Sequence, residues 1–398
     1  GTFDLDLGRV STTTPSNGVS FTNASAVSLT LDGASVFVGT GGSLSSATAS
    51  ATVVNGTLGF GGTVTTLKIV SIKDTNNGSV STTDDTNYLG VQITGLGADL
   101  IGLESVLEFH ASGVNVKVNK ATDTDNNAST TPSKLDWDSL ATSGITLASL
   151  AVDSAQDLHA DGTVALNALS GVLVAKGSFD LDLGQVSTTA PSNGVSFTNA
   201  SAVSLSLTNA AVFVGVGGSL SNATATANVV NGSLGFAGTV SSLQVVSIKD
   251  TNNGSVATTD DRSYLGVQIS GLTADLIGLE SILEFHAAAV NVKVNKATDT
   301  DNNALTIPAK LDWDSLTTSG MTLVSLVVDS ALDIHADGTV ALNALSGVLV
   351  ATGSFDLDLG QVSTTAPSNG VSFTNASAVS LTLTGAAVFV GTGGILSN

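Results

Sequence analysis

The chain has 398 residues, and its 33 acidic against 12 basic side chains give a net charge of −21 at pH 7. This balance argues against nucleic acid as a partner, because such binding depends on Lys and Arg that neutralise phosphates, and against docking on an anionic membrane face. Cysteine is absent and aromatic residues make up only 4%, which excludes disulfide bonds and disfavours a core of large aromatic anchors. No run of 18 apolar residues occurs, so we expect no membrane span.

A long internal repeat organises the sequence. The same stretch begins at residues 1, 177 and 353, so the period is 176 residues (177 − 1 and 353 − 177). Of the 46 aligned positions in the second and third copies, only four differ. We therefore divide the chain into repeat 1 (1–176), repeat 2 (177–352) and a partial repeat 3 (353–398). Because the chain begins at a repeat boundary without Met, we expect it to be a window from a longer protein.

Along repeat 2, short apolar runs that mostly alternate with polar residues predict strands. These runs cover residues 179–183, 195–197, 202–207, 211–216, 224–230, 234–236, 240–248, 264–269, 274–279, 282–285, 290–294, 321–328, 331–335, 340–345 and 348–351. Asn-Gly and Gly-Gly pairs separate many of them, and two polar stretches, 249–262 and 295–303, predict loops. Residues 311–316 fit one helical turn or a short strand. The best helix candidate, 276–285, is weakened by its glycine.

The pattern predicts an all-β fold, and two architectures explain it. One is a β-solenoid built from the 176-residue repeats, in which coils of roughly 20 residues stack on one another. The other is a string of tandem β-sandwich domains. We favour the solenoid, because residues 171–184 run across the repeat junction as a continuous strand pattern, whereas independent domains usually have a polar linker at such a boundary.

Two polar loops in each repeat carry oxygen side chains in an order that suits Ca²⁺, which prefers several oxygen ligands. Positions 1, 3 and 5 of the later loop are Asp123, Asp125 and Asn127 in repeat 1 and Asp299, Asp301 and Asn303 in repeat 2. The earlier loop offers Asp74 and Asn76 in repeat 1 and Asp250 and Asn252 in repeat 2. Lys at position 12 of the later loop excludes an EF-hand. Solvated turns made of ordinary turn residues are the alternative.

The four histidines occupy the same two positions in each repeat. They are His110, His159, His286 and His335. We predict that they are partly buried strand residues, because no Cys, no second His at ligand spacing and no HExxH pattern accompanies them.

A tryptophan lies between two carboxylates in each repeat. The two sets are Asp136, Trp137 and Asp138, and Asp312, Trp313 and Asp314. Carboxylates beside an aromatic ring are found in sugar-cleaving sites. Residues two apart on a strand point the same way, however, and nothing identifies a general acid, so we predict structural or turn roles.

The chain is built on a long repeat without Cys and contains segments such as GSFDLDLGQVS and ILEFHAAAVNVKVNKATDTD. In these features it resembles the repeat regions of giant bacterial surface proteins, the haemagglutinin-like and RTX-like adhesins. The calcium nonapeptide GGxGxDxUx of the RTX proteins is absent. The resemblance covers the whole chain and implies an extracellular or cell-surface location and an elongated β-rich rod. It also implies a role in attachment, aggregation or sheath formation, and it supplies no catalytic residue.

We therefore expect a non-enzymatic structural or adhesive protein that forms a stiff rod or filament body at the cell surface. Self-association is the expected partnership, and cell-surface or carbohydrate partners are further candidates. A calcium-stiffened adhesin rod is the first alternative. A carbohydrate-active β-helix enzyme is the second, and it would need a groove lined with carboxylates and aromatic rings, for which only two Trp and two Tyr are available.

Overall fold

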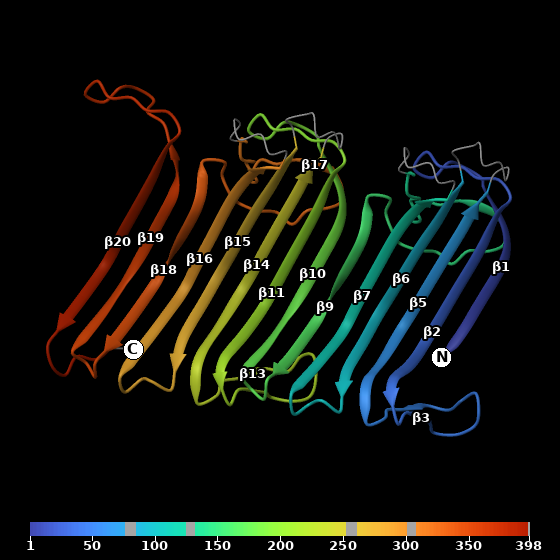
Figure 1. The fold of residues 1–398 in the computed structure, drawn as a ribbon, viewed down its shortest axis with the longest axis horizontal. Helices are drawn as coiled ribbons and strands as arrows, with labels where there is room; N and C mark the ends of the chain where they lie inside the picture. The colour runs from blue at the N-terminus through green and yellow to red at the C-terminus, as the bar shows by residue number, and fades with distance from the viewer. Residues whose placement is uncertain (76–84, 125–131, 252–260, 301–307, 397–398) are drawn as a thin grey trace. The chain divides into compact units, whose positions relative to one another are not determined.

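The computed structural model describes residues 1–75, 85–124, 132–251, 261–300 and 308–396 (Figure 1). All regular secondary structure in these residues is β, and the paired strands run antiparallel, which confirms the predicted all-β class. None of the described residues belongs to a helix long and apolar enough to cross a membrane. The chain divides into two compact units, Gly1–Val164 with Asp180–Gln185 (unit 1) and Ala165–Phe179 with Val186–Asn398 (unit 2).

Each unit is built on an open antiparallel sheet. Unit 1 holds β1 (Thr2–Thr12), β2 (Ala24–Thr40), β3 (Ser43–Leu44), β4 (Val53–Val54), β5 (Leu58–Asp74), β6 (Thr86–Ile101), β7 (Leu107–Asp123) and β8 (Thr142–Gly144). Strands β9 (Gln156–Ala168) and β10 (Leu173–Thr188) are divided between the units. Unit 2 holds β11 (Ala200–Val216), β12 (Ser219–Leu220), β13 (Val229–Val230), β14 (Leu234–Asp250), β15 (Arg262–Ile277), β16 (Leu283–Asp299), β17 (Thr318–Gly320), β18 (Leu332–Ala344), β19 (Leu349–Val362) and β20 (Ala376–Val390).

The strand order is a meander with few interruptions. In unit 1 it is β7-β6-β5-β2-β1-β8, and in unit 2 it is β20-β19-β18-β16-β15-β14-β11. Strands β3 and β4, and likewise β12 and β13, form separate two-stranded hairpins. Because consecutive strands of this order run antiparallel, short connections between them suffice.

Many of the predicted short strands are halves of longer ones, so the predicted ends between them were wrong. Residues 202–207 and 211–216 form one strand, β11, and Asn209 between them has φ 51°. Gly271 has φ 63° between the two halves of β15. Gly and Asn adopt this left-handed region readily, so a residue that favours a turn here makes a local irregularity inside a continuing strand. The register of β15 against β16 accordingly shifts between Ile269 and Ala274.

Two further predictions failed in the segment that follows β16. Residues 321–328, predicted as a strand, have no regular structure, and residues 311–316 form neither a helical turn nor a strand. Several of their apolar side chains are nevertheless buried, with Leu326 2% and Leu311 0% exposed, although Val327 is 52% exposed. The apolar pattern therefore marks packing against the sheet, which an irregular segment also achieves.

The sheet of unit 2 has one apolar and one polar face. One row of directly opposed residues consists of Leu205, Val245, Val267, Val294, Ile334, Leu359 and Val379. The row one residue further along each strand consists of Ser206, Gln244, Gln268, Lys293, His335, Asp358 and Ser380. Because successive side chains of a strand point to opposite faces, the first row belongs to an apolar face and the second to a polar face.

An irregular segment covers part of the polar face and builds the main core of unit 2. Residues 308–331 place Trp313 and Leu326 over sheet residues such as Ile248 and Tyr264. Asn295, 2% exposed, fastens this segment: its Nδ2 donates to the carbonyl oxygens of Leu311 and Asp329 at 2.8 and 2.9 Å, and its Oδ1 accepts from Trp313 Nε1 at 3.0 Å. Unit 1 has the equivalent core around Trp137.

The junction of repeats 2 and 3 lies inside a strand. Strand β19 crosses residues 352 and 353, pairs with β18 of repeat 2, and pairs with β20 of repeat 3. Thr352 faces Ala341 on one side and Ala387 on the other. Hydrogen bonding of the sheet is therefore continuous from one repeat into the next within unit 2.

Candidate functional site

The polar face carries a histidine whose ring is enclosed by carboxylates. In unit 2, His335 Nδ1 lies 2.8 Å from Asp358 Oδ1 and 3.6 Å from Asp356 Oδ1, and its Nε2 lies 3.0 Å from Asp337 Oδ1. The sheet positions all four: His335 is paired directly with Asp358, and Asp337 with Asp356, two residues along the same face. Asn291 Nδ2 donates to the other oxygen of Asp337 at 3.0 Å, which fixes that carboxylate.

Unit 1 contains the same arrangement. His159 Nδ1 lies 2.8 Å from Asp182 and 3.7 Å from Asp180, and its Nε2 lies 2.9 Å from Asp161. Asn115 Nδ2 donates to Asp161 Oδ2 at 2.9 Å. In both clusters the histidine comes from one repeat, and the aspartates come from the segment FDLDL near the start of the next repeat (residues 179–183 and 355–359). Each cluster therefore forms only where two repeats follow one another.

The other two histidines lie in smaller clusters. His286 Nδ1 lies 2.7 Å from Asp275, and its Nε2 lies 3.3 Å from Glu284. His110 has the equivalent partners Asp99 and Glu108, at 2.7 and 3.2 Å. The predicted location of these histidines in strands is confirmed, and each of the two rings has two carboxylate partners.

These carboxylates favour the protonated ring. The hydrogen bond with Asp275 raises the pKa of His286, against an opposing effect of burial, and Glu284 adds to the rise. Burial lowers the pKa of His335, but the hydrogen bonds with Asp358 and Asp337 outweigh it, so that the pKa rises. A protonated imidazole donates from both nitrogens, which matches a carboxylate on each side of the ring.

The larger clusters also have donor atoms that suit a divalent cation. His159, Asp180 and Asp182 each offer a ligand atom, and these atoms lie within 4.8 Å of one another, as do those of His335, Asp356 and Asp358. One imidazole nitrogen with carboxylate oxygens is a ligand set for zinc and related metals. Burial, followed by the charge of Asp182, raises the pKa of Asp180.

In each repeat the structure brings the first residues of the two predicted calcium loops to the same end of the sheet. Asp74 at the end of β5 is paired with Thr86 of β6, which is paired in turn with Asp123 at the end of β7. In repeat 2, Asp250 and Asp299 take the same positions on either side of Arg262. The remaining predicted ligands lie outside the described residues: Asn76, Asp125, Asn127, Asn252, Asp301 and Asn303.

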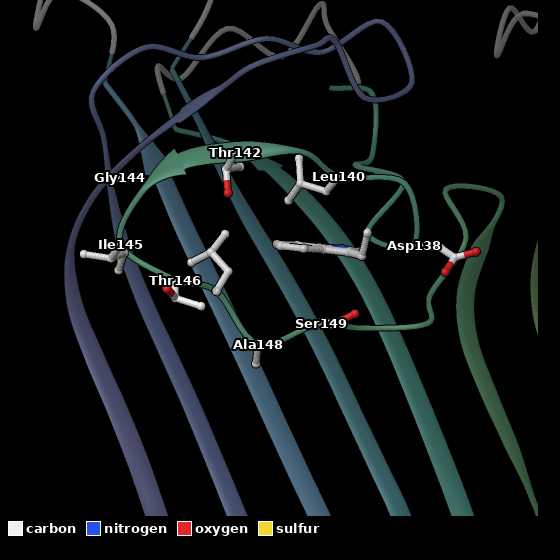
Figure 2. A pocket seen from close by; sticks show the side chains of 10 residues that line it. Asp138, Leu140, Thr142, Gly144, Ile145, Thr146, Ala148 and Ser149 are labelled. Atoms are coloured by element: carbon white, nitrogen blue, oxygen red, sulfur yellow. The ribbon is translucent and has the colours of Figure 1, made fainter.

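The tryptophan between two carboxylates is a core residue. Trp137 is 5% exposed, and its Nε1 donates to Asn119 Oδ1 at 2.9 Å. Asp136 Oδ2 accepts a hydrogen bond of 2.6 Å from Ser139. Figure 2 shows the segment that follows, which curves around a hollow of about 340 Å³ with Asp138 at its edge. These contacts give Asp136 and Trp137 structural roles, as predicted.

The sequence analysis did not predict the histidine clusters, although a constant spacing between the histidines and the aspartates could have indicated them. His159 precedes Asp182, and His335 precedes Asp358, by 23 residues in each case. The aspartates of the FDLDL segment were interpreted only as the polar positions of an alternating strand pattern. No family model, no curated protein and no solved structure matches the chain.

Proposed function

We propose that the chain is part of a non-enzymatic, repetitive structural or adhesive protein in which successive repeats build a stiff rod or filament body. The observation that carries this proposal is strand β19, which belongs to two repeats and is hydrogen-bonded to a strand of each. A junction of this kind transmits bending and tension through sheet hydrogen bonds instead of through a flexible linker. Rod length then follows the number of repeats.

The finer features of the proposal rest on the sequence. An extracellular or cell-surface location, with attachment to cell-surface or carbohydrate partners, follows from the resemblance to repetitive bacterial adhesins. The β-solenoid remains our preferred architecture for the complete array, and tandem β-sandwich domains are the alternative. The unbroken strand pattern at residues 171–184 and the course of β19 both support repeats that are fused and not separately folded.

Electron microscopy of this chain and of chains with added 176-residue repeats tests the proposal. We expect a stiff particle whose length increases by a constant amount with each repeat. A control chain carries a flexible Gly-Ser insertion between Thr352 and Gly353, inside β19, and it should bend at that point. Freely jointed beads in the unmodified chain would contradict the fused-repeat rod.

A calcium-stiffened rod is the second candidate, and the position of its acidic residues favours it. The sheet places Asp74 of β5 and Asp123 of β7 on either side of Thr86 of β6, and Asp74 is only 4% exposed. A hard cation would offset the repulsion between such carboxylates. Thermal unfolding, followed by circular dichroism with calcium and then with chelator, tests this candidate. A fall of tens of degrees on chelation supports calcium binding, and an unchanged melting temperature rejects it.

A further inference from the structure

The apolar face of unit 2 extends over seven strands without a charged residue in its two central rows. The second of these rows consists of Leu207, Leu243, Ile269, Val292, Ala336, Leu357 and Leu381. On β20 the side chains are largely exposed, with Val379 at 72% and Leu381 at 59%. Figure 1 shows these strands side by side within the unit.

The segment that builds the core lies on the opposite face. Val327 N–H donates to Gln268 Oε1 at 2.8 Å, and Val324 N–H donates to Ser204 Oγ at 2.9 Å. Both acceptors belong to the polar face. Within the described part of the chain, none of the buried hydrophobic clusters includes a residue from the two central apolar rows. On the other strands most residues of the two rows are half-buried, as in a sheet face with no layer packed on it. An apolar surface of this extent that no buried cluster covers marks an interaction site.

We propose that the apolar face of unit 2 packs against the same face of a second copy of this chain. The inference deepens the proposed structural role and rests on it: rods would associate in pairs, face to face. Two sheets pack in this way about 10 Å apart, with their side chains interdigitating. A face of Leu, Val, Ile and Ala can pack against an identical face, so both copies would use the same residues.

The area of the face is sufficient for a stable pair. Val203 and Leu265 on one side, in a row that also holds Ser247 and Lys296, and Phe355 and Leu383 on the other side extend the two central rows to about three. Seven strands at about 4.8 Å each and three rows at about 6.8 Å each give about 690 Å². A specific interface of standard size buries about 800 Å² per partner. Unit 1 carries an equivalent row, Leu5, Leu29, Ile69, Val91 and Val118.

The distribution of charge favours a second copy over a lipid surface. Acidic side chains such as Asp356 and Asp358 belong to the polar face, because they are the direct partners of Asp337 and His335. Face-to-face pairing therefore keeps these charges in water on the two outer surfaces. A net charge of −21 repels an anionic bilayer. A second copy carries the same charge, but face-to-face pairing brings together the two uncharged central rows and leaves the acidic polar faces on opposite sides of the pair.

Two matched double variants test the proposal, because they change neighbouring residues on the same two strands. Leu205→Lys with Leu243→Lys places charges on the apolar face, and Ser206→Lys with Gln244→Lys places the same charges on the polar face. Sedimentation velocity over a wide range of concentration measures association. We expect the unmodified chain and the polar-face variant to form a dimer, and the apolar-face variant to dimerise at least about 100-fold more weakly, since an unpaired ammonium would be buried.

Folding is checked independently by circular dichroism and by the emission of Trp313, which lies on the polar side of the sheet. If the lysine variant does not fold, Val245→Thr with Val267→Thr keeps β-branched shape while adding polarity, and it should also weaken the dimer. A monomeric unmodified chain, or equal association of both lysine variants, overturns the proposal. So does a monomer that binds phosphatidylcholine vesicles through this face. None of these results changes the rod length that tests the proposed function.

Discussion

Replacement of Asn295 by Ala should release the irregular segment that covers the polar face of unit 2. The side chain makes three hydrogen bonds in a site that is 2% exposed. At about 1 kcal/mol for each bond, the loss is about 3 kcal/mol. Since 1.4 kcal/mol corresponds to a factor of ten, the equilibrium between the docked and undocked segment should shift by roughly 100-fold.

The assay uses Trp313, the hydrogen-bond partner of Asn295, as the reporter. In a Trp137→Phe background the emission of Trp313 alone follows its exposure during denaturation with guanidinium. Asn295→Ala should move the transition to lower denaturant concentration, and Ala in place of the exposed Asn222 should leave it unchanged. A loss of less than about 1 kcal/mol would refute the reasoning, because a single net hydrogen bond accounts for that much.

Asn295→Asp separates the donors from the acceptor. The carboxylate still accepts from Trp313 Nε1 but cannot donate to the two carbonyl oxygens that Nδ2 serves. We expect a loss at neutral pH at least as large as that of the Ala variant, and partial recovery at acidic pH, where a protonated carboxyl donates one bond. Equal stability of the Asp variant at both pH values would count against this account.

Three further predictions concern the backbone, the packing and the pH dependence. Ala289 has φ 50° where repeat 1 has glycine, so Ala289→Gly should raise the free energy of unfolding by about 1 kcal/mol in a denaturant titration, and an unchanged midpoint would contradict it. A Cβ at Gly266 would lie 2.7 Å from Trp313 Cε2, so Gly266→Ala should destabilise by about 1–3 kcal/mol and red-shift Trp313 emission; an unaltered spectrum would argue otherwise. The pKa of His286 is higher in the folded protein than its unfolded value of about 6.5, so protonation of this ring stabilises the fold. This stability is fully present below about pH 6.5 and is lost as the pH rises through the folded pKa. The melting temperature should therefore fall as the pH rises through these two pKa values, and it should fall less steeply in His286→Gln.

Part of the functional geometry was visible in the sequence. The spacing between His335 and Asp358 recurs in both repeats, and the polar positions of FDLDL are those that a strand places on one face. The contact between His335 and Asp358 was not predictable, because it depends on the register of β18 against β19. That register pairs two residues that lie 23 positions apart in the sequence. The approach of Asp74 to Asp123 depends in the same way on two pairings through β6.

The period of 176 residues, the all-β class and the division of strand residues into apolar and polar sets can be read from the sequence alone. The class and the two sets follow from local chemistry, since alternation and β-branched side chains act over a few residues. The position of Asn209 within a strand and not at its end depends on tertiary contacts, because neighbouring strands supply the hydrogen bonds that carry the chain through an irregular residue. The packing of residues 308–331 on the polar face depends on tertiary contacts too, since Asn295 and Trp313 meet there through a hydrogen bond that no local pattern encodes.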